Sequence, residues 1–150
     1  AKGIGICLSH NCSNIRAFQS DQEIKVRSIP VICIPTTSGT GSEVNHWAVI
    51  SDPRTKEKLS IGDPRMVPHM AIVDPELTLT LPRKMTLWTG LDALTHALEA
   101  YVSILSNRLS DLLALEAIKL VLESLDHVVN HGDNLVAREH MALARYPGLY

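Results

Sequence analysis

The chain has 150 residues, of which 45% are hydrophobic and 20% charged, and its formal net charge is −2 at pH 7. This composition is that of an ordinary soluble globular chain with one sizeable core, and it excludes disorder, collagen and coiled coil. Lys and Arg number 14 against 16 Asp and Glu. Because no basic surplus is available to neutralise phosphates, we expect no nucleic-acid partner.

The apolar runs are far shorter than the roughly 20 residues that span a bilayer, so we expect no membrane association. The chain has three cysteines, Cys7, Cys12 and Cys33. No two of them have C-x-x-C spacing, and three cysteines cannot all form disulfides within one chain. This pattern favours a reducing, cytoplasmic compartment.

Taken in chain order, the predicted elements change in character near residue 82. Before that point, short β-like runs at 30–34, 47–51, 58–61 and 70–73 lie among most of the prolines and glycines, which predicts an α/β fold for residues 1–82. After it, the spacing predicts helices over 86–102, from a cap at Ser110-Asp111 to about 127, and over 135–144. Leu112, Leu115, Ile118, Leu122 and Leu125 form one stripe at helical spacing. Residues 83–150 are therefore predicted to be all-helical.

A loop rich in hydroxyls and glycines follows the apolar run at 30–34. The hydroxyl loop, as we call residues 35–43, contains Thr36, Thr37, Ser38, Gly39, Thr40, Gly41 and Ser42. Glycine lets the backbone approach a ligand closely, and hydroxyls with free N–H groups can bind phosphate or ribose oxygens. This composition fits a phosphate-bearing cofactor. The alternative is a connection whose hydroxyls cap the next helix. The loop matches neither the G-x-G-x-x-G sequence nor a Walker A sequence.

Two further candidates are a lysine and a carboxylate–histidine pair. Lys58, in the β-like run after the loop, could bind a phosphate or a ribose hydroxyl, although a single lysine is more often a solvated surface charge. Asp92 and His96 lie four residues apart, so on a helix they project from the same face and could bind one divalent cation. The alternative is a helix pair in which the carboxylate only orients the imidazole ring.

Four motifs, in order and spacing, resemble the iron-containing alcohol dehydrogenase family. They are IPTTSGTGSEV at 34–44, KLSI at 58–61, IVDPEL at 72–77 and GLDALTHALEAY at 90–101. The resemblance implies that residues 1–82 are the C-terminal part of a Rossmann-like dinucleotide-binding domain. It also implies that residues 83–150 are the first helices of an all-helical metal-binding domain.

The same resemblance assigns roles to the candidate residues. Thr36, Thr37, Gly39, Thr40, Gly41 and Ser42 would line the phosphates and nicotinamide ribose of NAD or NADP, and Lys58 would bind the ribose. Asp92 and His96 would be the first two of four ligands to Fe(II) or Zn(II). The expected reaction is hydride transfer between NAD(P) and a small alcohol or aldehyde, in an enzyme that is a homo-oligomer when full length.

Parts of the family pattern fall outside the sequence. The family's glycine-rich pyrophosphate turn would lie before Ala1, and its two further histidine ligands after Tyr150. We therefore expect the isolated segment to be inactive, because two ligands bind a catalytic cation weakly. The alternatives are a non-catalytic remnant or interaction module of the same fold, and a zinc-using polyol dehydrogenase of the glycerol type.

Overall fold

The computed structural model describes residues 1–20 and 23–146, and the chain forms two compact units. The first unit comprises residues 1–33 and 42–71, and the second comprises residues 34–41 and those from 72 onward. The last four residues of the predicted helical domain, 147–150, lie outside the described part.

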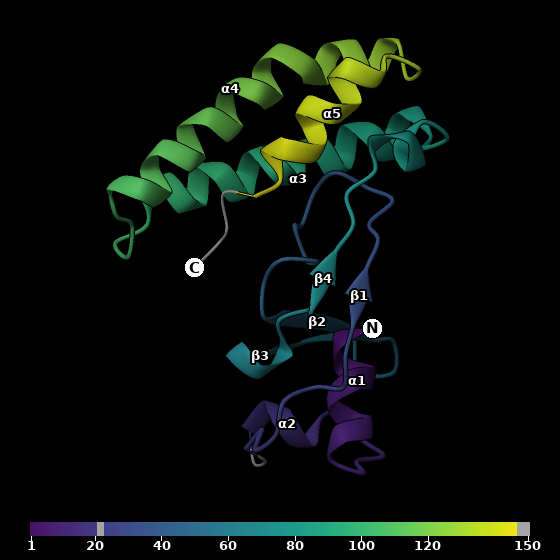
Figure 1. Cartoon of the computed structure of the whole chain (residues 1–150), viewed down its shortest axis with the longest axis vertical. Helices are drawn as coiled ribbons and strands as arrows, with labels where there is room; N and C mark the ends of the chain where they lie inside the picture. The colour runs from purple at the N-terminus through teal and green to yellow at the C-terminus, as the bar shows by residue number, and fades with distance from the viewer. Residues whose placement is uncertain (21–22, 147–150) are drawn as a thin grey trace. The chain divides into compact units, whose positions relative to one another are not determined.

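The first unit combines short helices with two pairs of strands (Figure 1). Its elements are α1 (Lys2–Ser9), α2 (Ala17–Ser20), β1 (Ile32–Cys33), β2 (Trp47–Asp52), β3 (Glu57–Gly62), the 3₁₀ helix η1 (Pro64–Met66) and β4 (Met70–Ala71). Strand β1 pairs with β4 in parallel, as expected of an α/β fold, and β2 forms an antiparallel hairpin with β3. The core is formed by Ile6, Phe18, Ile24, Ala48, Ile61 and Met66. All four predicted strands are present.

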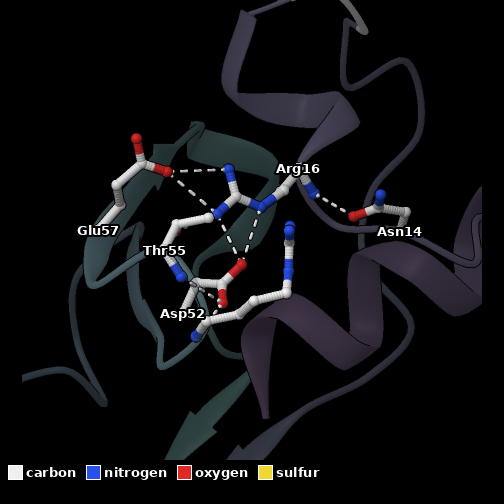
Figure 2. A network of polar contacts seen from close by, with 6 residues as sticks. Asn14, Arg16, Asp52, Thr55 and Glu57 are labelled. Carbon is white, nitrogen blue, oxygen red and sulfur yellow. Dashed lines mark hydrogen bonds and ion pairs between the residues drawn. The ribbon is translucent and has the colours of Figure 1, made fainter.

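Arg16, which directly precedes α2, forms hydrogen bonds and ion pairs with the β2–β3 hairpin (Figure 2). Arg16 Nη2 lies 2.6 Å from Asp52 Oδ2 and 3.1 Å from Glu57 Oε2, and it donates to Thr55 Oγ1 at 2.8 Å. Hydrogen bonds from Arg16 hold the pKa of the Asp52 carboxyl below its usual range. The hairpin turn contains Lys56 at a positive φ of 58°, so the polar contacts support a turn whose backbone is itself uncommon.

The second unit is helical, as predicted, so the order of an α/β part followed by helices is confirmed. Its elements are the 3₁₀ helix η2 (Pro75–Thr78), α3 (Arg83–Val102), α4 (Arg108–Asn130) and α5 (Leu135–Ala144). Helices α3, α4 and α5 lie side by side (Figure 1). The core between them is made mostly of small side chains: Ala93, Ala97, Ala117, Val121, Val128, Ala137, Met141 and Ala144. In the described part of the chain, no helix has the length and apolarity needed to cross a bilayer.

Helix α4 begins earlier than the sequence predicted, and a different residue caps it. Asn107 accepts from the N–H groups of Leu109 and Ser110, while the Ser110 hydroxyl accepts from the Asn107 N–H, which completes a capping box. Ser110 therefore takes part in the cap from inside the first turn. Asparagine is as good an N-cap as serine or aspartate, so the sequence contained two possible starts three residues apart.

The buried face of α4 differs from its leucine stripe. Leu112, Leu115 and Leu122 are exposed, while Ala114, Ala117, Val121, Ser124 and Val128 are buried. Small residues at the contact let the helix axes approach closely. Gly90 of α3 serves the same packing, because a Cβ there would overlap Leu125 Cδ1 and lie 3.0 Å from Met141 Cε. Close helix packing, rather than a ligand, explains this glycine.

Candidate functional site

The first part of the hydroxyl loop belongs to the helical unit, together with α3. Thr36 and Thr40 are exposed, whereas Ser38, Gly39 and Gly41 are buried. Gly41 has a φ of 56°, a left-handed conformation that side chains other than those of Gly, Asn and Asp rarely adopt. The loop thus presents threonine side chains to solvent while glycine allows its tight backbone path.

Gly39 brings this loop against α3 beside the predicted metal ligand. A Cβ at Gly39 would lie 3.1 Å from Asp92 Oδ2 and 3.1 Å from the Thr89 carbonyl oxygen. Such contacts are tighter than ordinary van der Waals contact, so only glycine fits without displacing a neighbour. Residues 35–41 of the hydroxyl loop and the Asp92 carboxylate therefore lie side by side within one compact unit.

Asp92 and His96 face one another along α3, as the four-residue spacing predicts. Asp92 Oδ1 lies 3.8 Å from His96 Nε2, and the two side chains are 42% and 38% exposed. Two metal–ligand bonds of about 2.1 Å span at most about 4.2 Å, so this separation lets both atoms reach one divalent cation. Among the described residues no group of three His, Cys, Asp or Glu side chains could hold a metal. Within the described part of the chain, the pair by itself could therefore offer a cation two donors.

A second arginine, which the sequence did not single out, holds the loop from the end of α5. Arg145 Nη1 donates a 2.6 Å hydrogen bond to the Thr37 carbonyl oxygen. Its Nη2 lies 3.2 Å from Tyr146 Oη, and its guanidinium stacks 5.3 Å from the centre of that ring. Arg145 is only 3% exposed. A buried, charge-assisted hydrogen bond of this kind restricts the backbone at one of the predicted cofactor-binding residues.

The remaining predicted residues, Ser42 and Lys58, belong to the first unit. Lys58 is exposed on β3, opposite Ser51 of β2. The Ser42 carbonyl accepts a 2.7 Å hydrogen bond from Lys2 Nζ, which also donates to Asn45 O at 3.1 Å and Asn45 Oδ1 at 2.9 Å. The end of the loop is therefore held by α1, another contact that the sequence did not indicate.

Comparison with known proteins identifies the family. Residues 1–75 match the family described as iron-containing alcohol dehydrogenase, and residues 86–148 match its C-terminal family. The chain belongs to the iron-containing alcohol dehydrogenase family. The matched regions contain both the hydroxyl loop and the Asp92–His96 pair.

Two similar proteins are much longer than the chain. The chain is 42% identical over 146 residues to an NAD-dependent methanol dehydrogenase of Bacillus methanolicus, covering 97% of the chain and 38% of that protein. It is 40% identical over 143 residues to a 1,3-propanediol dehydrogenase of Citrobacter freundii, covering 95% and 37%. The chain thus spans less than two fifths of the length of either iron-containing alcohol dehydrogenase relative.

Solved structures of the family share the fold. A structure of 1,3-propanediol oxidoreductase superimposes with a TM-score of 0.90 at 38% identity, covering 99% of this chain and 38% of that one. A sulfoacetaldehyde reductase of Bifidobacterium kashiwanohense in complex with NAD⁺ superimposes with a TM-score of 0.85 at 35% identity, covering 97% and 39%. The α/β and helical parts are therefore those of an iron-containing alcohol dehydrogenase.

Proposed function

We propose that the chain is part of an NAD-dependent, iron-containing alcohol dehydrogenase that interconverts a small alcohol and its aldehyde. The observation that carries the proposal is the contact of Gly39 with the Asp92 carboxylate, which puts a loop suited to a nucleotide beside a side chain suited to a cation. Hydride transfer to a nicotinamide ring needs the cofactor and the substrate oxygen to be held close together. Family membership supports the same reaction class.

In this proposal the hydroxyl loop binds the cofactor. The exposed Thr36 and Thr40 would donate to phosphate or ribose oxygens, and the backbone at Gly39 and Gly41 would permit close approach. Thr37 would act with its backbone fixed by Arg145. Ser42 and Lys58 are proposed to bind the nicotinamide ribose and its neighbouring phosphate. Such fixed groups align the reacting atoms, which is the protein's main contribution in a cofactor enzyme.

Asp92 and His96 are proposed to hold Fe(II) with ligands from other parts of the enzyme. A hard carboxylate oxygen and an imidazole nitrogen suit Fe(II), and their 3.8 Å separation is compatible with a shared cation. When bound, the metal polarises the substrate oxygen and lowers the pKa of the alcohol. Helix α3 keeps both side chains on one face, so both would be able to hold the same cation.

Cofactor binding by this chain tests the proposal directly. We expect NAD to bind with measurable heat in isothermal titration calorimetry. Thr40→Ala should weaken that binding by about 2- to 10-fold, because one hydrogen bond to the cofactor contributes about 0.5–1.5 kcal/mol. Thr80→Ala removes an exposed threonine outside the hydroxyl loop and should leave the affinity unchanged.

The opposite results would favour a non-catalytic remnant of the fold. No heat with NAD or NADP would show that this chain has no cofactor site of its own. Equal affinities for the parent chain and Thr40→Ala would show that the hydroxyl loop does not contact the cofactor at that residue.

A further inference from the structure

The C-terminal end of α1 brings two cysteines together. The Cys12 N–H donates to the Cys7 carbonyl at 2.8 Å, and the Asn11 N–H donates to the Leu8 carbonyl at 3.4 Å. Asn11 lies between them with a left-handed φ of 49°. These features define a Schellman motif, in which the residue after the left-handed one packs its side chain against the residue five positions earlier. In this chain those two side chains are the thiols of Cys12 and Cys7.

The thiols are close, hydrogen-bonded and accessible. Cys7 Sγ donates to Cys12 Sγ across 3.7 Å, and Cys12 Sγ lies 3.0 Å from the Asn14 carbonyl oxygen. Both cysteines are half-buried, so a small reagent can reach them. A disulfide needs the two sulfurs at about 2.0 Å, so they must approach from their present separation of 3.7 Å.

Metal binding does not account for this pair. Among the described residues, no third Cys, His, Asp or Glu side chain completes a metal-binding group with them. The nearby His10 is already engaged at both ring nitrogens: Nδ1 lies 3.0 Å from the Ile6 carbonyl, and Nε2 accepts from the Lys25 N–H at 3.0 Å. The chemistry available to the pair is therefore that of two neighbouring thiols.

We propose that Cys7 and Cys12 form an oxidisable dithiol that closes to an internal disulfide by exchange with a low-molecular-weight disulfide such as oxidised glutathione. The Schellman motif supplies the proximity, because its backbone hydrogen bonds hold both residues in place before any bond forms. Cys7 and Cys12 are not among the residues proposed to bind the cofactor or the metal, and the test of this proposal needs neither.

The exchange proceeds in two balanced steps. Cys12, as its thiolate, attacks one sulfur of oxidised glutathione and releases one glutathione thiolate, which takes up a proton. Cys7 then loses its proton to solvent and attacks the Cys12 sulfur, which expels the second glutathione. Two protein thiols are oxidised and one disulfide is reduced to two thiols. Burial raises the pKa of the Cys7 thiol, which favours Cys7 as the second nucleophile.

Trypsin digestion makes the test simple, because cleavage after Lys2 and Arg16 leaves both cysteines in one peptide, 3–16. The reduced chain is equilibrated with about a tenfold excess of oxidised glutathione. The free thiols are then alkylated, and the masses of the tryptic peptides are measured by mass spectrometry. We expect peptide 3–16 to be about 2 Da lighter than its reduced form and to carry no alkyl group. Recovery of that peptide with both cysteines alkylated, or only as glutathione adducts, would overturn the proposal.

Variants distinguish the contribution of the Schellman motif to disulfide closure from the ordinary reactivity of two thiols. Cys7→Ser and Cys12→Ser should stop at a mixed disulfide with glutathione, whereas Cys33→Ser, on β1, should close as the parent chain does. Asn11→Gly keeps the left-handed turn and should leave the equilibrium for closure unchanged. Asn11→Val disfavours that turn and should lower the equilibrium constant for closure by about 5- to 30-fold. Equal closure by Asn11→Gly and Asn11→Val would refute the role of the Schellman motif.

Discussion

A buried lysine shows how one side chain can depend on residues forty positions away. Lys2 is only 6% exposed, and its ammonium group donates to three acceptors, all of them on Ser42 and Asn45. Burial lowers its pKa to about 8, while electrostatic interactions with Cys33 and Glu43 act in the opposite direction. Three hydrogen bonds use all the donors of an ammonium group, so the charge is tolerated although burial still disfavours it.

Lys2 gives the stability of the chain a specific pH dependence. Its folded pKa lies near 8, below the ordinary value of 10.5, so between these values the unfolded chain binds more protons. The contribution of Lys2 to the free energy of unfolding should therefore increase as pH rises from 8 to 10.5. Urea denaturation at pH 7.5 and pH 9.5, for the parent chain and Lys2→Met, measures this contribution as a difference between the two proteins.

Lys2→Met is the appropriate comparison because it keeps an unbranched side chain of similar length and removes the charged end. The thiol of Cys7, whose pKa burial raises, remains in both proteins, so its effect on the pH dependence is common to them. A stability difference that is the same at both pH values would contradict the lowered pKa of Lys2.

Single residues also mark where reasoning from sequence stops. Asp92 and His96 could be paired from sequence because helical periodicity alone puts them on one face. Lys2 and Arg145 could not be found in this way, since a lone basic residue is normally exposed. Each is buried and donates a hydrogen bond to a residue distant in the sequence: Lys2 to Ser42, and Arg145 to Thr37. Only the fold creates those contacts.

At the scale of elements, the close approach of the hydroxyl loop to α3 depends on a glycine at position 39. A Cβ at Gly39 would press on the Thr89 carbonyl oxygen, a backbone atom that cannot move without disturbing α3. We expect Gly39→Ala to lower the free energy of unfolding by about 1–3 kcal/mol, the usual effect of overpacking. The midpoint of urea denaturation measures the change.

Gly90→Ala is a matched control because this glycine is also buried in α3 packing. The atoms that its Cβ would meet, Leu125 Cδ1 and Met141 Cε, are the ends of flexible side chains. Leu125 also borders an apolar groove of about 320 Å³ into which it can shift. Because alanine gains about 1 kcal/mol of helix propensity over glycine, Gly90→Ala should change stability little. A larger loss for Gly90→Ala than for Gly39→Ala would contradict this account.

The elements themselves were largely predictable. The predicted helix over 135–144 coincides with α5, and the strands at 47–51 and 58–61 correspond to β2 and β3. The start of α4 was predicted three residues late because Asn107 and Ser110 are both good caps and both join the capping box. Periodicity predicted that α4 is a helix but did not identify its buried face, which is set by alanines that fit against α3.

At the scale of the whole molecule, the sequence predicted an α/β part followed by helices, and the structure has both. The compact units do not follow the chain in a simple order, because residues 34–41 leave the first unit and pack with the helices. Composition changes along the sequence only once, near residue 82, so it could not reveal that residues 34–41 pack with the helices. This packing brings Gly39 close to Asp92.

The exposed leucines of α4 lead to a prediction about the whole chain. Leu112, Leu115 and Leu122 are 59%, 46% and 69% exposed and lie on one side of the helix. Exposed apolar side chains grouped on one side of a helix favour association in water. We expect the chain to self-associate with increasing concentration in sedimentation velocity, and the triple variant Leu112→Gln, Leu115→Gln, Leu122→Gln to shift it towards monomer.

The matched control is Glu116→Gln with Glu123→Gln, which changes exposed polar residues of the same helix without removing apolar surface. This control should associate at least as strongly as the parent chain. Because the three leucines are exposed, their replacement should change the free energy of unfolding by no more than about 0.5 kcal/mol at each position. If the triple variant associates as strongly as the parent chain, the exposed leucines of α4 do not cause the self-association.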